Sequence, residues 1–125
     1  MIRHILAIDD SAAMREILSA TLTTAGYEVT LAADGDEGLE QALAMAFDLV
    51  LTDQYMPGKT GVDLIAELRA NPAYETTPIL LLTTESGEPF KAAARAAGAT
   101  GWIEKPLDPD MLTELVSTLD APEAS

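Results

Sequence analysis

Five side chains that could take part in a reaction lie at the ends of short apolar segments of the chain. They are the carboxylates of Asp9, Asp10 and Asp53, the hydroxyl of Thr83 and the amine of Lys105. Three carboxylates forced together repel one another, so a divalent cation is the natural way to keep them ionised at neutral pH. Oxygen ligands and the absence of cysteine favour Mg²⁺ over zinc. With a lysine and a hydroxyl beside it, such a cluster has the parts that phosphoryl transfer needs.

These residues depend on a regular alternation of apolar and helical segments for their position. The predicted strands are 2–8, 27–32, 47–52, 79–82 and 101–104. The predicted helices run from a cap at Asp10 or Ser11 to Gly26, and then over 34–45, 61–71, 89–97 and 108–119. This alternation demands parallel strands with right-handed crossovers, so we expect an α/β fold with helices on both faces of the sheet. Because ligands bind beyond the carboxyl ends of such strands, the five polar residues should converge there.

Length and charge limit the classes of function. The chain has 125 residues, which suits one domain, placed at 1–120 with a frayed tail at 121–125. Seven basic residues against 21 acidic ones give a net charge of −14, which disfavours binding to nucleic acid. No apolar run reaches the roughly 18 to 20 residues of a membrane span, and the N-terminus is unlike a secretory signal. A cytoplasmic protein with no nucleic-acid or membrane partner is expected.

Other residues are expected to have structural roles. Asp34, Asp36, Asp63 and Asp108 lie away from the strand ends and suit helix caps or first turns. His4 is expected to be an ordinary strand residue, and the five methionines are expected to contribute to packing. The apolar positions at helical spacing, expected to face the core, include Ile17, Leu43 and Met111.

The order of the polar residues resembles the receiver domain of two-component response regulators over nearly the whole chain. The matching features are Asp9-Asp10, Asp53 followed by Met56-Pro57 and Gly61, Thr83, and Lys105-Pro106. The segment 98–106 also resembles the chemotaxis regulators of the CheY type. The resemblance implies a flavodoxin-like, doubly wound sheet of five parallel strands in the order 2-1-3-4-5, with five helices.

The resemblance also implies roles for the residues around the acceptor. Asp53 would accept a phosphoryl group from a phosphohistidine of a histidine kinase, and Lys105 and the Thr83 hydroxyl would bind that group. The Lys105-Pro106 peptide bond would be cis and aim the lysine. A shift of Thr83 would free space for Trp102 to turn inward, which would remodel the face formed by the fourth helix, fifth strand and fifth helix.

The same resemblance implies a magnesium site and a pair of residues that tune the phosphate lifetime. Mg²⁺ would be held by Asp10, Asp53 and the backbone carbonyl of Tyr55, with Asp9 acting largely through water. Tyr55 lies two residues after the acceptor, where chemotaxis regulators often have Asn, and Glu85 lies two residues after the switch threonine. In this family these positions flank the attacking water, so a bulky Tyr55 is expected to shield the acyl phosphate.

The expected protein is a stand-alone, monomeric signalling phosphoacceptor and not an enzyme, because the predicted elements end near Leu119 and leave no output domain. Its expected partners are a histidine kinase, the flagellar motor switch protein and a phosphatase. Two alternatives stay open: a phosphate sink or relay carrier without a motor target, and a phosphorylation-independent interaction module.

Two other classes of protein fit the sequence less well. A haloacid dehalogenase-type phosphatase would have a second Asp in place of Tyr55. An FMN carrier would need a Ser/Thr/Gly-rich loop where this chain has Asp9-Asp10-Ser11.

Overall fold

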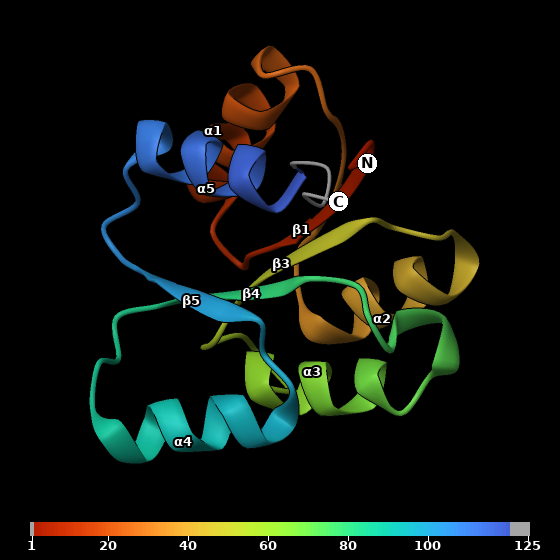
Figure 1. Ribbon diagram of the computed structural model, residues 1–125, viewed down its shortest axis with the longest axis vertical. Coiled ribbons are helices and arrows are strands. Elements are labelled where there is room, and N and C mark those ends of the chain that lie inside the picture. Colours follow the sequence, from red (N-terminus) through yellow and green to blue (C-terminus); the bar gives the residue numbers. More distant parts are fainter. Residues whose placement is uncertain (1, 121–125) are drawn as a thin grey trace, which may run out of the picture.

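The computed structural model describes residues 2–120, which form a five-stranded parallel sheet between two layers of helices (Figure 1). The strand order is β2-β1-β3-β4-β5, as expected. The strands are β1 (His4–Ile8), β2 (Glu28–Ala32), β3 (Leu49–Asp53), β4 (Ile79–Thr83) and β5 (Gly101–Glu104). The helices are α1 (Ala12–Thr24), α2 (Gly35–Ala44), α3 (Gly61–Arg69), α4 (Glu88–Ala97) and α5 (Pro109–Asp120), with a short 3₁₀ helix at Pro72–Tyr74. The tail expected at 121–125 lies outside the described residues.

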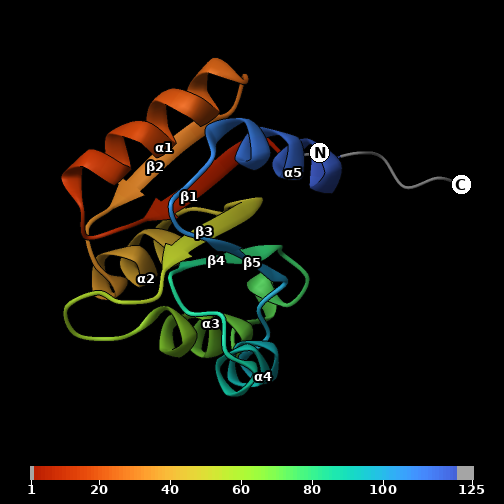
Figure 2. The same cartoon turned by 90° about the vertical axis from the view of Figure 1, so that its left-hand side faces the viewer.

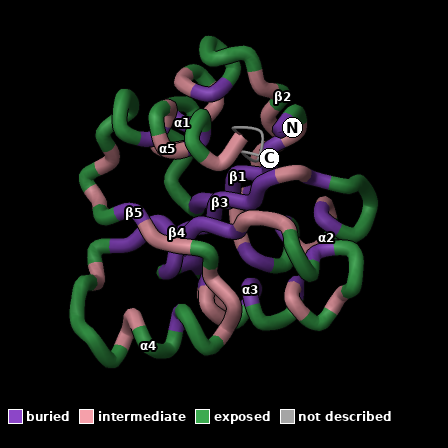
Figure 3. The backbone as a smooth tube through the Cα atoms, viewed as in Figure 1, coloured by how far each residue is buried: buried purple, intermediate pink, exposed green. Residues whose placement is uncertain are grey.

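Each face of the sheet has its own apolar core. Helices α1 and α5 cover one face, where Leu18 and Leu22 pack with Leu112 and Val116, and helices α2, α3 and α4 cover the other (Figure 2). The middle strands β3 and β4 are buried along their whole length, which explains why their sequences are almost continuously apolar (Figure 3). None of the helices in residues 2–120 is long and apolar enough to cross a membrane.

The helix boundaries follow the expected caps. Ser11 and not Asp10 caps α1, because its hydroxyl accepts a hydrogen bond from the backbone N–H of Met14. The predicted structural acids include Asp34, which caps α2, and Asp63, which completes a capping box with Thr60. Asp108 accepts hydrogen bonds from the first-turn N–H groups of Asp110 and Met111, while Asp36 pairs with Lys59.

Several apolar side chains expected in the core are exposed instead. Ile17, Leu43 and Met111 are 43%, 61% and 56% exposed. Each lies next to a buried residue of the same helix, namely Leu18, Ala42 and Leu112. A helix turns by about 100° per residue, so a neighbour of a buried position lies at the rim of the buried stripe. Met45 is exposed too, so the expectation that every methionine packs in the core was wrong.

Candidate functional site

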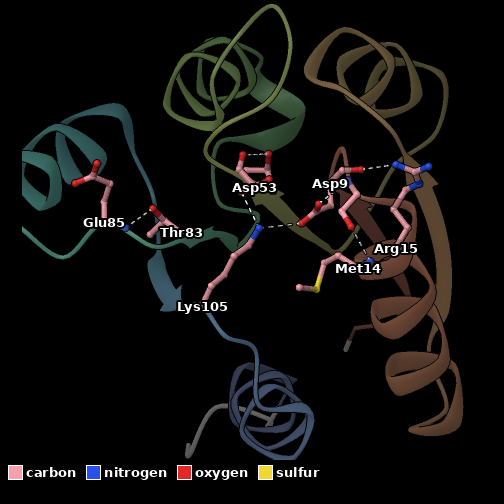
Figure 4. Close-up of polar contacts among 9 residues, drawn as sticks. Asp9, Met14, Arg15, Asp53, Thr83, Glu85 and Lys105 are labelled. Atoms are coloured by element: carbon pink, nitrogen blue, oxygen red, sulfur yellow. Dashed lines mark hydrogen bonds and ion pairs between the residues drawn. The ribbon is translucent and has the colours of Figure 1, made fainter.

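The carboxyl ends of four neighbouring strands bring the predicted residues to one edge of the sheet. In the parallel register, Asp53 of β3 lies beside Leu82, and Thr83 of β4 lies beside Glu104. Asp9 and Lys105 directly follow β1 and β5, so their side chains enter the same space (Figure 4). The predicted convergence is therefore confirmed for residues that are 96 positions apart in the chain.

Three carboxylates form the acidic part of this site. Oxygen atoms of Asp9, Asp10 and Asp53 lie within 4.8 Å of one another. Asp9 and Asp53 are buried, whereas Asp10 is exposed to solvent. The position of Asp9 is fixed locally, because its carboxylate accepts a hydrogen bond of 2.9 Å from the Ser11 N–H and its backbone carbonyl accepts one of 2.7 Å from Arg15. The turn after β1 thus holds a buried carboxyl group beside Asp53.

Lys105 is the cation of the site. Its Nζ lies 3.1 Å from Asp53 Oδ1 and 3.4 Å from Asp9 Oδ2 (Figure 4). The Lys105 N–H donates to the Thr83 carbonyl at 2.9 Å, which ties the end of β5 to the end of β4. The Lys105-Pro106 peptide bond is cis, as the resemblance to receiver domains implied.

The electrostatic balance of the site disfavours the ionised form of Asp53 when no further cation is bound. Burial raises the pKa of the Asp53 carboxyl above its usual value; the hydrogen bond from Lys105 opposes this rise, and the charges of Asp9 and Asp10 add to it. Burial alone would lower the pKa of Lys105, but its hydrogen bond to Asp53 and the two buried carboxylates raise it above the usual value. Lys105 therefore stays charged while one positive charge faces three carboxylates.

The donor set fits a magnesium ion. Carboxylate oxygens clustered within 4.8 Å are the hard ligands that Mg²⁺ prefers, and it is usually bound by one or two protein carboxylates plus water and phosphate oxygens. A cation here would also relieve the repulsion that raises the Asp53 pKa. We propose that Asp10, Asp53 and the Tyr55 carbonyl would be the direct ligands, with Asp9 acting through water.

Hydrogen bonds connect Thr83, Glu85 and Tyr55 beside the site. Thr83 Oγ1 accepts a hydrogen bond of 2.9 Å from the Glu85 N–H, which leaves its own proton available to a phosphoryl oxygen. The Tyr55 hydroxyl donates to Glu85 Oε1 at 2.7 Å, so the loops after β3 and β4 are joined. The sequence singled out Tyr55 and Glu85 individually, but nothing in it indicated this hydrogen bond.

The loop after Asp53 is held by residues that the sequence analysis did not assign to the site. Gln54 is buried, and its side-chain carbonyl accepts a hydrogen bond of 2.9 Å from the Val62 N–H at the start of α3. A Cβ atom at Gly61 would lie only 2.5 Å from the Asp53 carbonyl oxygen, so only glycine allows α3 to approach this closely. The position of Gly61 in the receiver-domain pattern was the available signal for this constraint.

Trp102 lies on β5, away from the carboxylates. Its ring is half-buried and packs against the core between the sheet and α4. The side chains of Lys91 and Arg95 lie over the ring, at 5.7 Å and 5.4 Å from its centroid.

The chain is similar to known signalling proteins over almost its whole length. Residues 5–117 match the family described as the response regulator receiver domain. The chain is 40% identical to chemotaxis protein CheY1 of Helicobacter pylori, covering 88% of this chain and 90% of that protein. It is 36% identical to transcriptional regulatory protein FixJ of Bradyrhizobium diazoefficiens, covering 92% of this chain but only 55% of FixJ.

Solved structures agree with this assignment. A response regulator protein from Burkholderia multivorans is 66% identical over the full length of both chains, with a TM-score of 0.86. The chemotaxis protein CheY4 of Vibrio cholerae is 42% identical, with a TM-score of 0.90 over 94% of this chain and 98% of that one. The chain belongs to the response regulator receiver domain family, whose members are signalling phosphoacceptor modules.

Proposed function

We propose that Asp53 accepts a phosphoryl group from a phosphohistidine of a histidine kinase. The observation that carries this proposal is the position of its carboxylate: it lies at the end of a central strand, 3.1 Å from the Lys105 ammonium and beside the Asp9 and Asp10 carboxylates. Receiver domains take phosphate from histidine kinases, and this chain has the acceptor, cation and hydroxyl in one place.

In the transfer, one oxygen of the ionised Asp53 carboxylate attacks phosphorus, a P–O bond forms and the P–N bond to the kinase imidazole breaks. The bonding electrons leave with the imidazole nitrogen, and the product is an acyl phosphate. Lys105 loses its contact with Asp53 Oδ1 and binds a phosphoryl oxygen, while the Thr83 hydroxyl donates to another. Bound Mg²⁺ supplies positive charge that offsets the charge on the phosphoryl oxygens.

Phosphorylation would supply enough free energy to switch the domain. A charge-assisted hydrogen bond contributes about 1.5 to 3 kcal/mol, and moving a population from 1:99 to 99:1 takes about 5.5 kcal/mol. Two bonds at the upper end of this range, or three of about 2 kcal/mol each, reach this value. The contact that Lys105 gives up with Asp53 is subtracted from the gain. As Thr83 moves toward the phosphoryl group, the space it leaves accommodates the Trp102 ring, and the α4-β5-α5 face changes shape.

The proposed output is binding of a partner to the α4-β5-α5 face, with the flagellar motor switch protein as the partner. The similarity to two proteins named for chemotaxis supports this target. We also propose that the protein is a cytoplasmic monomer and that a phosphatase acts on its phosphorylated form. A phosphate sink would have the same chemistry, and a pull-down with the motor switch protein, with and without phosphorylation, separates the two roles.

The acceptor is tested by incubating the protein with acetyl phosphate and Mg²⁺ and measuring its intact mass. We expect a mass gain of one phosphoryl group that disappears on treatment with hydroxylamine, which cleaves acyl phosphates. Asp53→Asn should abolish the gain, and Asp63→Asn, outside the site, should retain it. Persistent phosphorylation of Asp53→Asn would contradict the proposal.

A further inference from the structure

Basic side chains are scarce in this chain, so the partner of each one is informative. The chain has seven Lys and Arg residues against 21 acidic residues. Four of the basic residues are engaged: Lys59 and Lys105 by carboxylates, and Arg15 and Arg69 by backbone carbonyl groups. Arg3 precedes β1, at the opposite end of the sheet from the acidic site. Within residues 2–120, the remaining two, Lys91 and Arg95, form no ion pair.

Lys91 and Arg95 instead share one aromatic ring. They are four residues apart on α4 and therefore lie on the same side of the helix, toward Trp102 of β5. Both cationic groups lie within 6 Å of the Trp102 ring centroid, which is the range of cation–π attraction. The Trp102 ring thus contacts two cations that form no ion pair with a carboxylate. Both lie on the α4-β5-α5 face, which we propose binds the partner.

We propose that Lys91 and Arg95 are exchanged between two partners: the Trp102 ring in the resting domain, and the carboxylates of an acidic partner segment in the activated one. The inference rests on the proposed function, because it requires Trp102 to turn inward on phosphorylation. When the ring leaves the helix surface, both cations lose their aromatic contact and become free to bind carboxylates.

Charge complementarity identifies the occupant. The chain has a net charge of −14, so an acidic segment is repelled by most of its surface and attracted where two uncompensated cations lie together. The exposed Ala92 and Ala96, which neighbour these cations on the helix surface, leave room for an extended or helical segment to approach. The face therefore suits a peptide in which glutamate or aspartate alternates with apolar residues.

The resting half of the exchange is tested through the Trp102 fluorescence, because Trp102 is the only tryptophan. Beryllofluoride with Mg²⁺, a stable mimic of the acyl phosphate, is titrated into the wild type, the Lys91→Gln/Arg95→Gln variant and an Arg3→Gln control. Each cation–π contact corresponds to about a two- to fivefold bias toward the resting state. The double variant should therefore reach half-saturation at a beryllofluoride concentration about 4- to 25-fold lower, with the control unchanged. An unchanged or higher midpoint in the double variant overturns the inference.

The activated half is tested with a defined probe, a fluorescein-labelled peptide of repeated Glu-Ala-Leu units, by fluorescence anisotropy. The matched peptide has Gln in place of every Glu. We expect the beryllofluoride-bound wild type to bind the Glu peptide at least about tenfold more tightly than it binds the Gln peptide. It should also bind the Glu peptide at least about tenfold more tightly than the unactivated protein does. The Lys91→Gln/Arg95→Gln variant should lose this preference. Equal binding of the two peptides, binding independent of activation, or no binding by the activated wild type overturns the inference.

The two experiments also separate this inference from the function on which it rests. A Trp102 signal that responds in the wild type but not in Asp53→Asn supports the phosphorylation-driven switch, whatever the charge variants do. A signal that fails to respond in the wild type, or persists in Asp53→Asn, contradicts the switch itself.

Discussion

The Lys105 ammonium lies 3.1 Å from an Asp53 oxygen and is the cation nearest to the acceptor among the described residues. Replacing it by Met leaves Asp53 and Asp9 buried without compensation. Breaking a fully buried pair costs about 3 to 5 kcal/mol; because the Lys105 side chain is 21% exposed, we expect the free energy of unfolding to fall by about 2 kcal/mol in EDTA. Urea denaturation measures this loss.

A double-mutant cycle identifies the cause of that loss. Asp53→Asn removes one of the two uncompensated charges, so Lys105→Met should cost clearly less free energy of unfolding in the Asp53→Asn background than in the wild type. Equal costs in both backgrounds would mean that Lys105 stabilises the protein through the packing of its aliphatic chain and not through charge.

The raised pKa of Asp53 predicts a pH dependence in the metal-free protein. Asp53 binds its proton more tightly in the folded state than in the unfolded chain, where the pKa of an Asp carboxyl is about 3.9. The stability that this group contributes is therefore present below that pH and is lost as the pH rises through the raised folded pKa. In EDTA, Asp53→Asn should gain stability relative to the wild type as the pH rises from about 4 through the raised folded pKa, and the difference should then level off. Parallel urea curves at each pH measure the difference, and a constant difference would contradict it.

Magnesium binding provides a third prediction, centred on the exposed ligand. Asp10 is exposed, so Asp10→Asn should change the metal-free free energy of unfolding by less than about 0.5 kcal/mol. Mg²⁺ that binds only the folded wild type adds about 2.7 kcal/mol at 100 times its Kd, and Asp10→Asn should need far more Mg²⁺ for the same rise in Tm. Glu40→Gln, an exposed acid on α2, is the matched control. An identical Mg²⁺ response in Asp10→Asn would exclude Asp10 as a ligand.

Much of the site could be predicted because it depends on where strands end. Asp9, Asp53 and Lys105 each end or follow an apolar strand, and parallel strands place all their carboxyl ends at one edge. The prediction needed only the alternation of strands and helices and no knowledge of side-chain packing. Boundaries were less certain: β3 includes Asp53 itself, and α3 ends at Arg69, two residues before the expected stop.

Contacts between loops could not be predicted, because no local pattern specifies them. Tyr74 was part of no predicted element, yet it is buried, and its hydroxyl donates to the carbonyls of Ala42 and Met45 at 2.6 Å and 3.0 Å. Arg69 belonged to a predicted helix, but its guanidinium donates to the carbonyls of Gly98 and Thr77, and burial lowers its pKa. These side chains satisfy backbone groups that become buried only after distant segments have folded together.

The hydrogen bond between Tyr55 and Glu85 predicts how long the acyl phosphate survives. This hydrogen bond raises the pKa of the Tyr55 phenol, so the hydroxyl stays protonated at neutral pH and keeps donating to Glu85. Although half of the Tyr55 side chain is exposed, the bond ties it to the loop after β4, and we propose that the ring there shields the acyl phosphate from an attacking water. Tyr55→Ala removes both the ring and the bond, and the rate of dephosphorylation should rise about tenfold.

Tyr55→Phe separates the two contributions, because it keeps the ring and removes only the hydrogen bond to Glu85. We expect a rate between those of the wild type and Tyr55→Ala, since an untethered ring shields the acyl phosphate for only part of the time. Glu85→Gln, which retains an oxygen acceptor for the phenol, should stay close to the wild type. The measurement is the decay of radiolabelled phosphoprotein after the donor is removed. Decay that is equally fast in the wild type and Tyr55→Ala would show that Tyr55 does not shield the phosphoryl group.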